Sequence, residues 1–180
     1  MLPDSDTRQC ITAAARALKL DPSARPVPSE NYHMTLAFVG EVLESQLAPL
    51  LKVGGSQRAR GFTVRFDTYE YWPKAQAVVA VARDFPASLE RLWRQIHAGL
   101  AQHSHVPKHE RLRPHVTIAR KVPQAPVLQA MSAFDWKVRA ITLMQSDTTG
   151  ARSVYTVVDT PGDYWMRTRR ARKSLSFRCI

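Results

Sequence analysis

His-Met-Thr-Leu-Ala at residues 33–37 and His-Val-Thr-Ile-Ala at residues 115–119 are two copies of one short pattern, H-x-T-[L/I]-A. Nearly half of the 180-residue chain separates them. Side chains alternate between the two faces of a strand, so each copy would place its histidine and threonine on one face and larger apolar side chains on the other. Solenoid repeats have shorter periods. The pattern therefore predicts two similar halves, each with an apolar strand face and a polar one.

The length of 180 residues and the hydrophobic content of 44% fit one globular domain, which can have two lobes. No apolar run approaches the ~20 residues that a membrane-spanning helix needs. Residues 1–4 have neither the basic region nor the apolar core of a signal peptide. Cys10 and Cys179 stand near opposite ends without metal-type spacing. These features predict a cytoplasmic protein with free thiols and no membrane segment.

The chain is basic, with a formal net charge of +11. Part of this excess lies in a C-terminal run with no acidic residue after Asp163, made of Arg167, Arg169, Arg170, Arg172, Lys173 and Arg178. The rest of the chain is still positive, which suits a polyanionic ligand such as RNA, although charge can equally serve solubility alone. Because periodicity ends near Pro161, we expect residues 1–160 to form one bilobal domain and residues 161–180 a basic, poorly ordered extension.

Apolar periodicity, capping residues and chain breakers predict the secondary structure. Helices are expected at residues 5–19, 45–52 and 87–102, and strands at residues 33–39, 62–66, 77–82, 134–145 and 153–158. Gly54 and Gly55 should end the second helix, and residues 147–150 should form a hairpin turn. The strands are not regularly separated by helices, as they would be in a doubly wound sheet, so the order favours an antiparallel α+β fold.

The paired histidines are the strongest candidates for chemistry. A lone strand histidine is usually structural, but two in matching contexts are hard to explain by packing. Histidine titrates near neutral pH, so one ring can be neutral while the other is protonated, as general base and general acid catalysis requires. Thr35 and Thr117 could donate hydrogen bonds to phosphate oxygens, although threonine is also a good strand former. The chain has no Gly-rich phosphate loop, no G-x-S-x-G and no C-x-x-C.

With their flanks, ENYHMTLAFVG at residues 30–40 and RPHVTIAR at residues 113–120, the two motifs resemble the signatures of the 2H (two-histidine) phosphoesterases. They are most similar to the branch of bacterial RNA 2′,3′-cyclic phosphodiesterases, also called 2′-5′ RNA ligases. The likeness covers roughly residues 2–160 and includes residues 133–158. It implies a bilobal α+β fold with pseudo-twofold symmetry, in which two antiparallel sheets surround a central cleft and the helices lie outside. Members usually begin with an apolar strand, where only Met1 and Leu2 stand here.

The resemblance also implies an activity. Its members hydrolyse a 2′,3′-cyclic phosphate at an RNA 3′ end to a 2′-phosphate without metal or other cofactor, and the reverse activity is 2′-5′ RNA ligation. Carried over, His33 would be the proton donor and His115 the proton acceptor, although the sequence alone does not fix that order. The implied partner is an RNA with a cyclic phosphate end, such as a tRNA half or another oligonucleotide, bound by a monomer.

Two further residues, one aromatic cluster and one loop are secondary candidates. Arg120 could neutralise a phosphate, but strict alternation points it away from His115, and a twist or bulge would be needed. Phe38, or the aromatic cluster of residues 69–72, could stack on a base, with core packing as the alternative for Phe38. Three loop histidines have the spacing H-x-H-x3-H: His103, His105 and His109. This spacing is compatible with a metal site, but a solvated loop is the simpler interpretation.

The sequence is compatible with two rival functions. The same chemistry could act on a small cyclic nucleotide or on an ADP-ribose cyclic phosphate. Alternatively, the chain could be an RNA-binding module that keeps the cleft without turnover. The presence of both histidines and both threonines disfavours the binding module.

Overall fold

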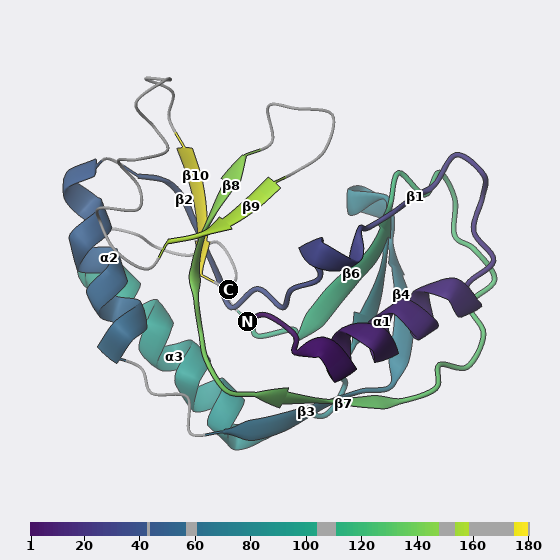
Figure 1. Ribbon diagram of the computed structural model, residues 1–180, viewed down its shortest axis with the longest axis horizontal. Coiled ribbons are helices and arrows are strands. Elements are labelled where there is room, and N and C mark those ends of the chain that lie inside the picture. Colours follow the sequence, from purple (N-terminus) through teal and green to yellow (C-terminus); the bar gives the residue numbers. More distant parts are fainter. Residues whose placement is uncertain (43, 57–60, 104–110, 148–153, 159–174, 180) are drawn as a thin grey trace.

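The protein is described here from a computed structural model, covering residues 1–42, 44–56, 61–103, 111–147, 154–158 and 175–179. Two four-stranded antiparallel sheets and one two-stranded ribbon form the fold, together with three α-helices in the described part of the chain. The two larger sheets lie in separate lobes, and Figure 1 shows the N-terminus between them. The helices lie on the outside of the lobes. The predicted bilobal α+β architecture is therefore confirmed.

The first sheet has the strand order β1-β6-β5-β4. Its strands are β1 (Arg25–Pro26), β6 (His115–Arg120), β5 (Ala77–Val81) and β4 (Thr68–Trp72). The sequence AVVAV makes β5 buried along its whole length, as suits an inner strand covered on both faces. Helix α1 (Ser5–Ala17) packs against this lobe, and Tyr69 of β4 donates a hydrogen bond of 2.7 Å to the carbonyl of Ala14. The sheet thus holds the second H-x-T motif in an inner strand.

The second sheet has the strand order β2-β10-β8-β9. Its strands are β2 (Ala37–Val42), β10 (Leu175–Cys179), β8 (Leu143–Asp147) and β9 (Val154–Val157). Helices α2 (Glu44–Ser56) and α3 (Ala87–Gln102) pack against each other at this lobe. Gly99 allows them to come close, because a Cβ atom there would lie 2.9 Å from Cγ1 of Val53. The first H-x-T motif leads directly into β2.

A ribbon of β3 (Phe62–Phe66) and β7 (Phe134–Val138) runs along the lower edge of Figure 1, below both lobes. The alternating burial of β7 places Phe134, Trp136 and Val138 on one face. The rings of Phe66 and Phe134 stack at a centroid distance of 5.2 Å, and Trp136 is completely buried. This face joins one continuous core that includes residues of all three α-helices. The ribbon therefore links the two lobes through shared packing.

Most predicted elements are confirmed. The helices expected at residues 5–19 and 87–102 are α1 and α3, and the strands expected at residues 62–66 and 77–82 are β3 and β5. Asp4 caps α1, with its carboxylate accepting a 3.0 Å hydrogen bond from the backbone N–H of Thr7. Strands β8 and β9 pair as expected for a hairpin, but the predicted turn at residues 147–150 lies largely outside the described residues.

Other boundaries were predicted wrongly. Helix α2 continues through Gly54 and Gly55 to Ser56, since its packing against α3 offsets the low helix propensity of glycine. The strand expected at residues 134–145 is divided into β7 and β8, which belong to different sheets. The aromatic cluster of residues 69–72, to which the sequence assigned no element, forms most of strand β4. Aromatic residues favour such half-buried strand positions.

The first motif was expected inside a strand, but β2 begins only at Ala37. The segment before it still alternates, with Tyr32, Met34 and Leu36 buried and His33 and Thr35 partly exposed. The backbone of Met34 pairs with that of Met1, in hydrogen bonds of 2.9 Å and 3.1 Å, rather than with a strand of either large sheet. The polar and apolar sides of the motif are therefore as predicted, although its backbone is not part of a sheet ladder.

The C-terminal part contains a strand that the sequence did not predict. β10 (Leu175–Cys179) lies between β2 and β8 in the second sheet, where a poorly ordered extension was expected. Its alternation of apolar residues with Ser176 and Arg178 fits a strand, but five residues beside a basic run give only a weak signal. Residues 159–174 and 180 lie outside the described residues, so the expectation for them stays a prediction.

Candidate active site

His33 stands directly after a short turn that fixes its backbone. The 3-10 helix η1 (Ser29–Asn31) precedes it, and Arg8 of α1 donates a hydrogen bond to the carbonyl of Ser29. Nδ1 of His33 lies 2.7 Å from the carbonyl oxygen of Asn31, two residues earlier in the chain. A carbonyl oxygen can only accept, so Nδ1 carries the proton of this bond. In the neutral ring the lone pair is therefore on Nε2.

His115 is held in the same way at the start of β6. Its Nδ1 lies 2.8 Å from the carbonyl oxygen of Arg113, again two residues earlier. The ring is partly exposed, and Val116 beside it is completely buried. The two motifs thus repeat not only their side chains but also the hydrogen bond that orients the imidazole. Each neutral ring directs its basic nitrogen, Nε2, away from its own backbone, as proton transfer to a ligand requires.

Each imidazole also packs against one aromatic ring. The centroid of His33 lies 4.7 Å from that of Tyr155 in β9, and the centroid of His115 lies 4.5 Å from that of Trp72 in β4. The planes are tilted by 58° and 54°, respectively. The two aromatic partners come from different sheets. The pseudo-symmetry of the site therefore extends to the packing of the rings.

The surroundings of His115 include a polar network. The indole N–H of Trp72 donates a 2.8 Å hydrogen bond to Glu70, which also pairs with Arg113. The guanidinium of Arg113 lies 5.0 Å from the centroid of the Trp72 ring. Burial acts to raise the pKa of Glu70, but the hydrogen bonds from Trp72 and Arg113 and the positive charges of Arg113 and His115 lower it below the usual 4.5. This network restrains the ring that packs on His115.

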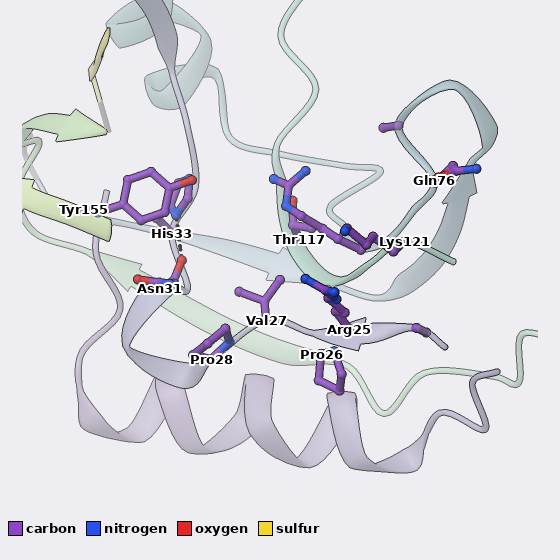
Figure 2. Close-up of a pocket in the computed structure, with 13 residues that line it drawn as sticks. Arg25, Pro26, Val27, Pro28, Asn31, His33, Gln76, Thr117, Lys121 and Tyr155 are labelled. Carbon is purple, nitrogen blue, oxygen red and sulfur yellow. Dashed lines mark hydrogen bonds between the residues drawn. The ribbon is translucent and has the colours of Figure 1, made fainter. Parts of the chain in front are cut away.

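His33 faces a pocket of about 610 Å³. Its wall includes Thr117 of the second motif, and Figure 2 shows His33 and Tyr155 at one end of the pocket and Lys121, Gln76 and Arg25 at the other. One residue from each motif therefore lines a single pocket. His115 and Thr35 are not part of its wall. His115 precedes Thr117 by two residues in β6, and Thr35 follows His33 by two residues.

Arg120 reaches the same pocket because β6 contains a bulge. Val78 pairs with Ala119 and Val79 with Thr117, so the pairing with β5 skips Ile118. Ile118 and Ala119 are consequently both buried, and Arg120 returns to the face of Thr117. Strict alternation would have turned Arg120 away. The structure thus places a cation in the same pocket wall as Thr117 of the second motif.

Phe38 lies elsewhere. It is a half-buried residue of β2, opposite Arg178 of β10 in the strand register, and is not part of the pocket wall. Of the three loop histidines, His103 is exposed after α3, whereas His105 and His109 lie outside the described residues. Within the described part of the chain, no group of three His, Cys, Asp or Glu residues could hold a metal ion. None of the described helices is long and apolar enough to cross a membrane.

The chain has relatives among known proteins. A family model described as the 2'-5' RNA ligase superfamily matches residues 2–150. The chain belongs to this superfamily. The RNA 2',3'-cyclic phosphodiesterase of Escherichia coli (strain K12) is 31% identical over 144 residues, which span 78% of this chain and 81% of the relative. The RNA 2',3'-cyclic phosphodiesterase of Thermus thermophilus is 27% identical over 168 residues, which span 88% of this chain and 84% of the relative.

Solved structures agree on the fold. The crystal structure of a phosphoesterase matches with 26% identity and a TM-score of 0.73, covering 88% of this chain and 91% of that one. E. coli LigT complexed with ATP matches with 26% identity and a TM-score of 0.70, covering 88% and 90% of the two chains. The resemblance to 2H phosphoesterases that the motifs indicate is therefore confirmed, as is the fold it implies.

Sequence reasoning did not find all of the residues around the two histidines. Tyr155 gave no signal beyond strand alternation, and its place beside His33 depends on how β9 joins its sheet. Glu70 was hidden between two tyrosines of a cluster interpreted only as aromatic. Arg25 lies in a proline-rich stretch, residues 20–31, which lacks the apolar periodicity of a helix or strand. Arg113 was quoted as a flank of the second motif, but the hydrogen bond that its carbonyl accepts from His115 is a backbone property without a side-chain signature.

Proposed function

We propose that this protein hydrolyses 2′,3′-cyclic phosphates at the 3′ ends of RNA to 2′-phosphates, without a metal ion. The observation that carries the proposal is the matched pair of motif histidines, each oriented through Nδ1 by the carbonyl two residues earlier. The two relatives named RNA 2',3'-cyclic phosphodiesterase support the choice of substrate. The positive charge of the chain suits a polyanionic substrate.

The proposed mechanism is an in-line displacement at phosphorus. His115, through Nε2, takes a proton from the attacking water while a bond forms between that oxygen and phosphorus. The bond between phosphorus and O3′ breaks, and protonated His33 gives its proton to O3′. The products are a 3′-hydroxyl and a 2′-phosphate. His115 is then protonated and His33 neutral, and exchange with solvent restores the starting states.

The hydroxyls and the cation would stabilise the charge that develops on the phosphoryl oxygens. Thr35 and Thr117 donate hydrogen bonds to these oxygens, and Arg120 adds a positive charge from the bulged end of β6. Phe38 is half-buried in β2 and outside the pocket wall, so no base-stacking role is proposed for it. If the 5′-hydroxyl of a second RNA replaces water, the same proton transfers create a 2′-5′ bond, which is the ligase reaction. Cytoplasmic location and a monomeric state remain predictions from the sequence.

The test is an assay with an RNA oligonucleotide ending in a 2′,3′-cyclic phosphate, in the presence of a strong chelator. We expect a 2′-phosphate product and a bell-shaped dependence of kcat/KM on pH, because one histidine must be neutral and the other protonated. A 3′-phosphate product would reverse the assignment of the bond that breaks. No turnover by the wild type, or activity that chelation abolishes and added metal restores, would refute the proposal.

A further inference from the structure

A group of like charges lies at the end of the pocket away from His33. Arg25 of β1 and Arg120 of β6 are direct cross-strand partners, so their side chains leave the same face of the sheet side by side. Like charges placed directly opposite each other destabilise a sheet. Among the described residues, neither arginine forms an ion pair with a carboxylate. The arrangement therefore favours an anion between the two strands.

The next residue adds a third cation. Lys121 is exposed and lines the pocket together with Arg25 and Arg120, and none of the described residues that line the pocket is an aspartate or glutamate. Figure 2 shows Arg25 and Lys121 well separated from His33 and Tyr155, with Thr117 between the two ends. The cationic end is thus distinct from the histidine end, although both belong to one cavity.

The backbone at this end is unusual. Gln76 has a φ angle of 45° and Lys121 one of 54°, and these are the two non-glycine residues with positive φ in the described part of the chain. Both line the pocket, and the N–H of Val122 donates a 3.0 Å hydrogen bond to the carbonyl of Gln76. Residues other than glycine rarely adopt positive φ angles, and the backbone strain that these angles cause is concentrated at functional sites. The backbone is therefore in an unfavourable conformation at Lys121, where this side chain lines the pocket.

We propose that Arg25 and Lys121, beside Arg120, form a second phosphate subsite for the phosphate on the 5′ side of the terminal nucleotide. The inference rests on the proposed function. An RNA whose 3′ end is closed by the cyclic phosphate continues only through its 5′ oxygen, so its next phosphate is the nearest second anion. A cavity of about 610 Å³ has room for a nucleotide as well as the reacting phosphate. The subsite makes an RNA end a better substrate than a mononucleotide.

The experiment compares three substrates with the full chain: adenosine 2′,3′-cyclic phosphate, the same compound with a 5′-phosphate, and the dinucleotide ApA with a cyclic phosphate end. We expect the 5′-phosphate and the dinucleotide each to raise kcat/KM by about tenfold over the mononucleotide, because each supplies an anion to two or three exposed cations. The gain should appear mainly in KM, since the subsite does not contact the reacting bond.

The variant Arg25→Gln with Lys121→Asn removes both charges, and asparagine tolerates positive φ. It should lose the preference for a 5′-phosphate while turning over the mononucleotide as the wild type does. The matched control is Arg91→Gln with Lys137→Asn, which removes two exposed cations of α3 and β7 that do not line the pocket. It should keep the preference. Lys121→Gly should also reduce the preference and raise the melting temperature, because glycine relieves the strain.

The outcomes separate the two proposals. A wild type that hydrolyses none of the three substrates refutes the proposed function. A wild type that hydrolyses the mononucleotide as well as the other two refutes the subsite alone. A preference that survives in the Arg25→Gln, Lys121→Asn variant also refutes it, since the 5′-phosphate is then recognised elsewhere. Equal loss in the control pair would mean that general charge, and not this cluster, attracts the substrate.

Discussion

The two motif histidines have the same hydrogen bond but different supports. His115 begins an inner strand of a four-stranded sheet, and its aromatic partner Trp72 is restrained by Glu70 and Arg113. His33 lies before β2, in a segment outside the sheet ladders, and its aromatic partner Tyr155 also forms the wall of the pocket. One chemical unit can therefore be oriented by a rigid sheet in one lobe and by a short turn and a pocket wall in the other.

Removing either imidazole is the largest expected effect. His33→Ala and His115→Ala should each lower kcat/KM by about 10³-fold, within the range for the loss of a general acid or base. The double variant should be little worse than either single one, because the two residues act as a unit. His103→Ala, an exposed histidine after α3, is the control and should retain full activity. A single variant that keeps more than a tenth of the activity would break the equivalence of the two motifs.

The two motif threonines are expected to have the next largest effect. Thr117→Val should lower kcat by about 100-fold, as expected for the loss of one donor to a developing anion. Thr117→Ser keeps the hydroxyl and should retain most of the activity. If the motifs are equivalent, Thr35→Val behaves in the same way. A normal rate in Thr35→Val alongside a slow Thr117→Val would mean that only the second motif binds the phosphoryl oxygens.

The aromatic partners should differ in which kinetic constant they affect. Trp72→Ala should lower kcat by about tenfold with little change in KM, because it loosens the orientation of His115. Trp72→Phe keeps a ring against His115 and should restore most of the rate. Tyr155→Ala should raise KM as well, since Tyr155 lines the pocket. Identical profiles for the two alanine variants would contradict the difference in support.

The smallest effect concerns stability. The pKa of Glu70 is lowered in the folded protein, so its stabilising interactions are present above the unfolded value near 4.5 and are lost as the pH falls through the lowered pKa. Glu70→Gln should therefore reduce the free energy of unfolding by about 1 kcal/mol above that value. Below the lowered pKa of Glu70, the wild type and the Glu70→Gln variant should become equally stable. Denaturant unfolding at several pH values measures this, and a difference that grows in acid would show the opposite sign.

The sequence predicted what depends on side-chain pattern. The apolar run of β5 and the stripe of α3 are strong local signals. The repeated H-x-T pattern predicted a site of His33, Thr35, His115 and Thr117, of which His33 and Thr117 line one pocket. It did not predict what depends on pairing between distant segments. The skipped residue Ile118, which turns Arg120 toward Thr117, follows from the register between β5 and β6. Tyr155 reaches His33 only through the order of strands in the second sheet.

Strand β10 has a consequence for assembly of the second lobe. It lies between β2 and β8, so residues 175–179 complete a sheet whose edge strand β2 begins at residue 37. Such distant pairing is slow to form, because the entropy cost of closing a long loop comes before any stabilising contact is made. Until then β2 and β8 expose unsatisfied hydrogen-bonding edges to which a strand of another molecule could add. Folding intermediates of this protein should therefore be prone to strand exchange, and a supplied peptide with the sequence LSFRC should compete for that place.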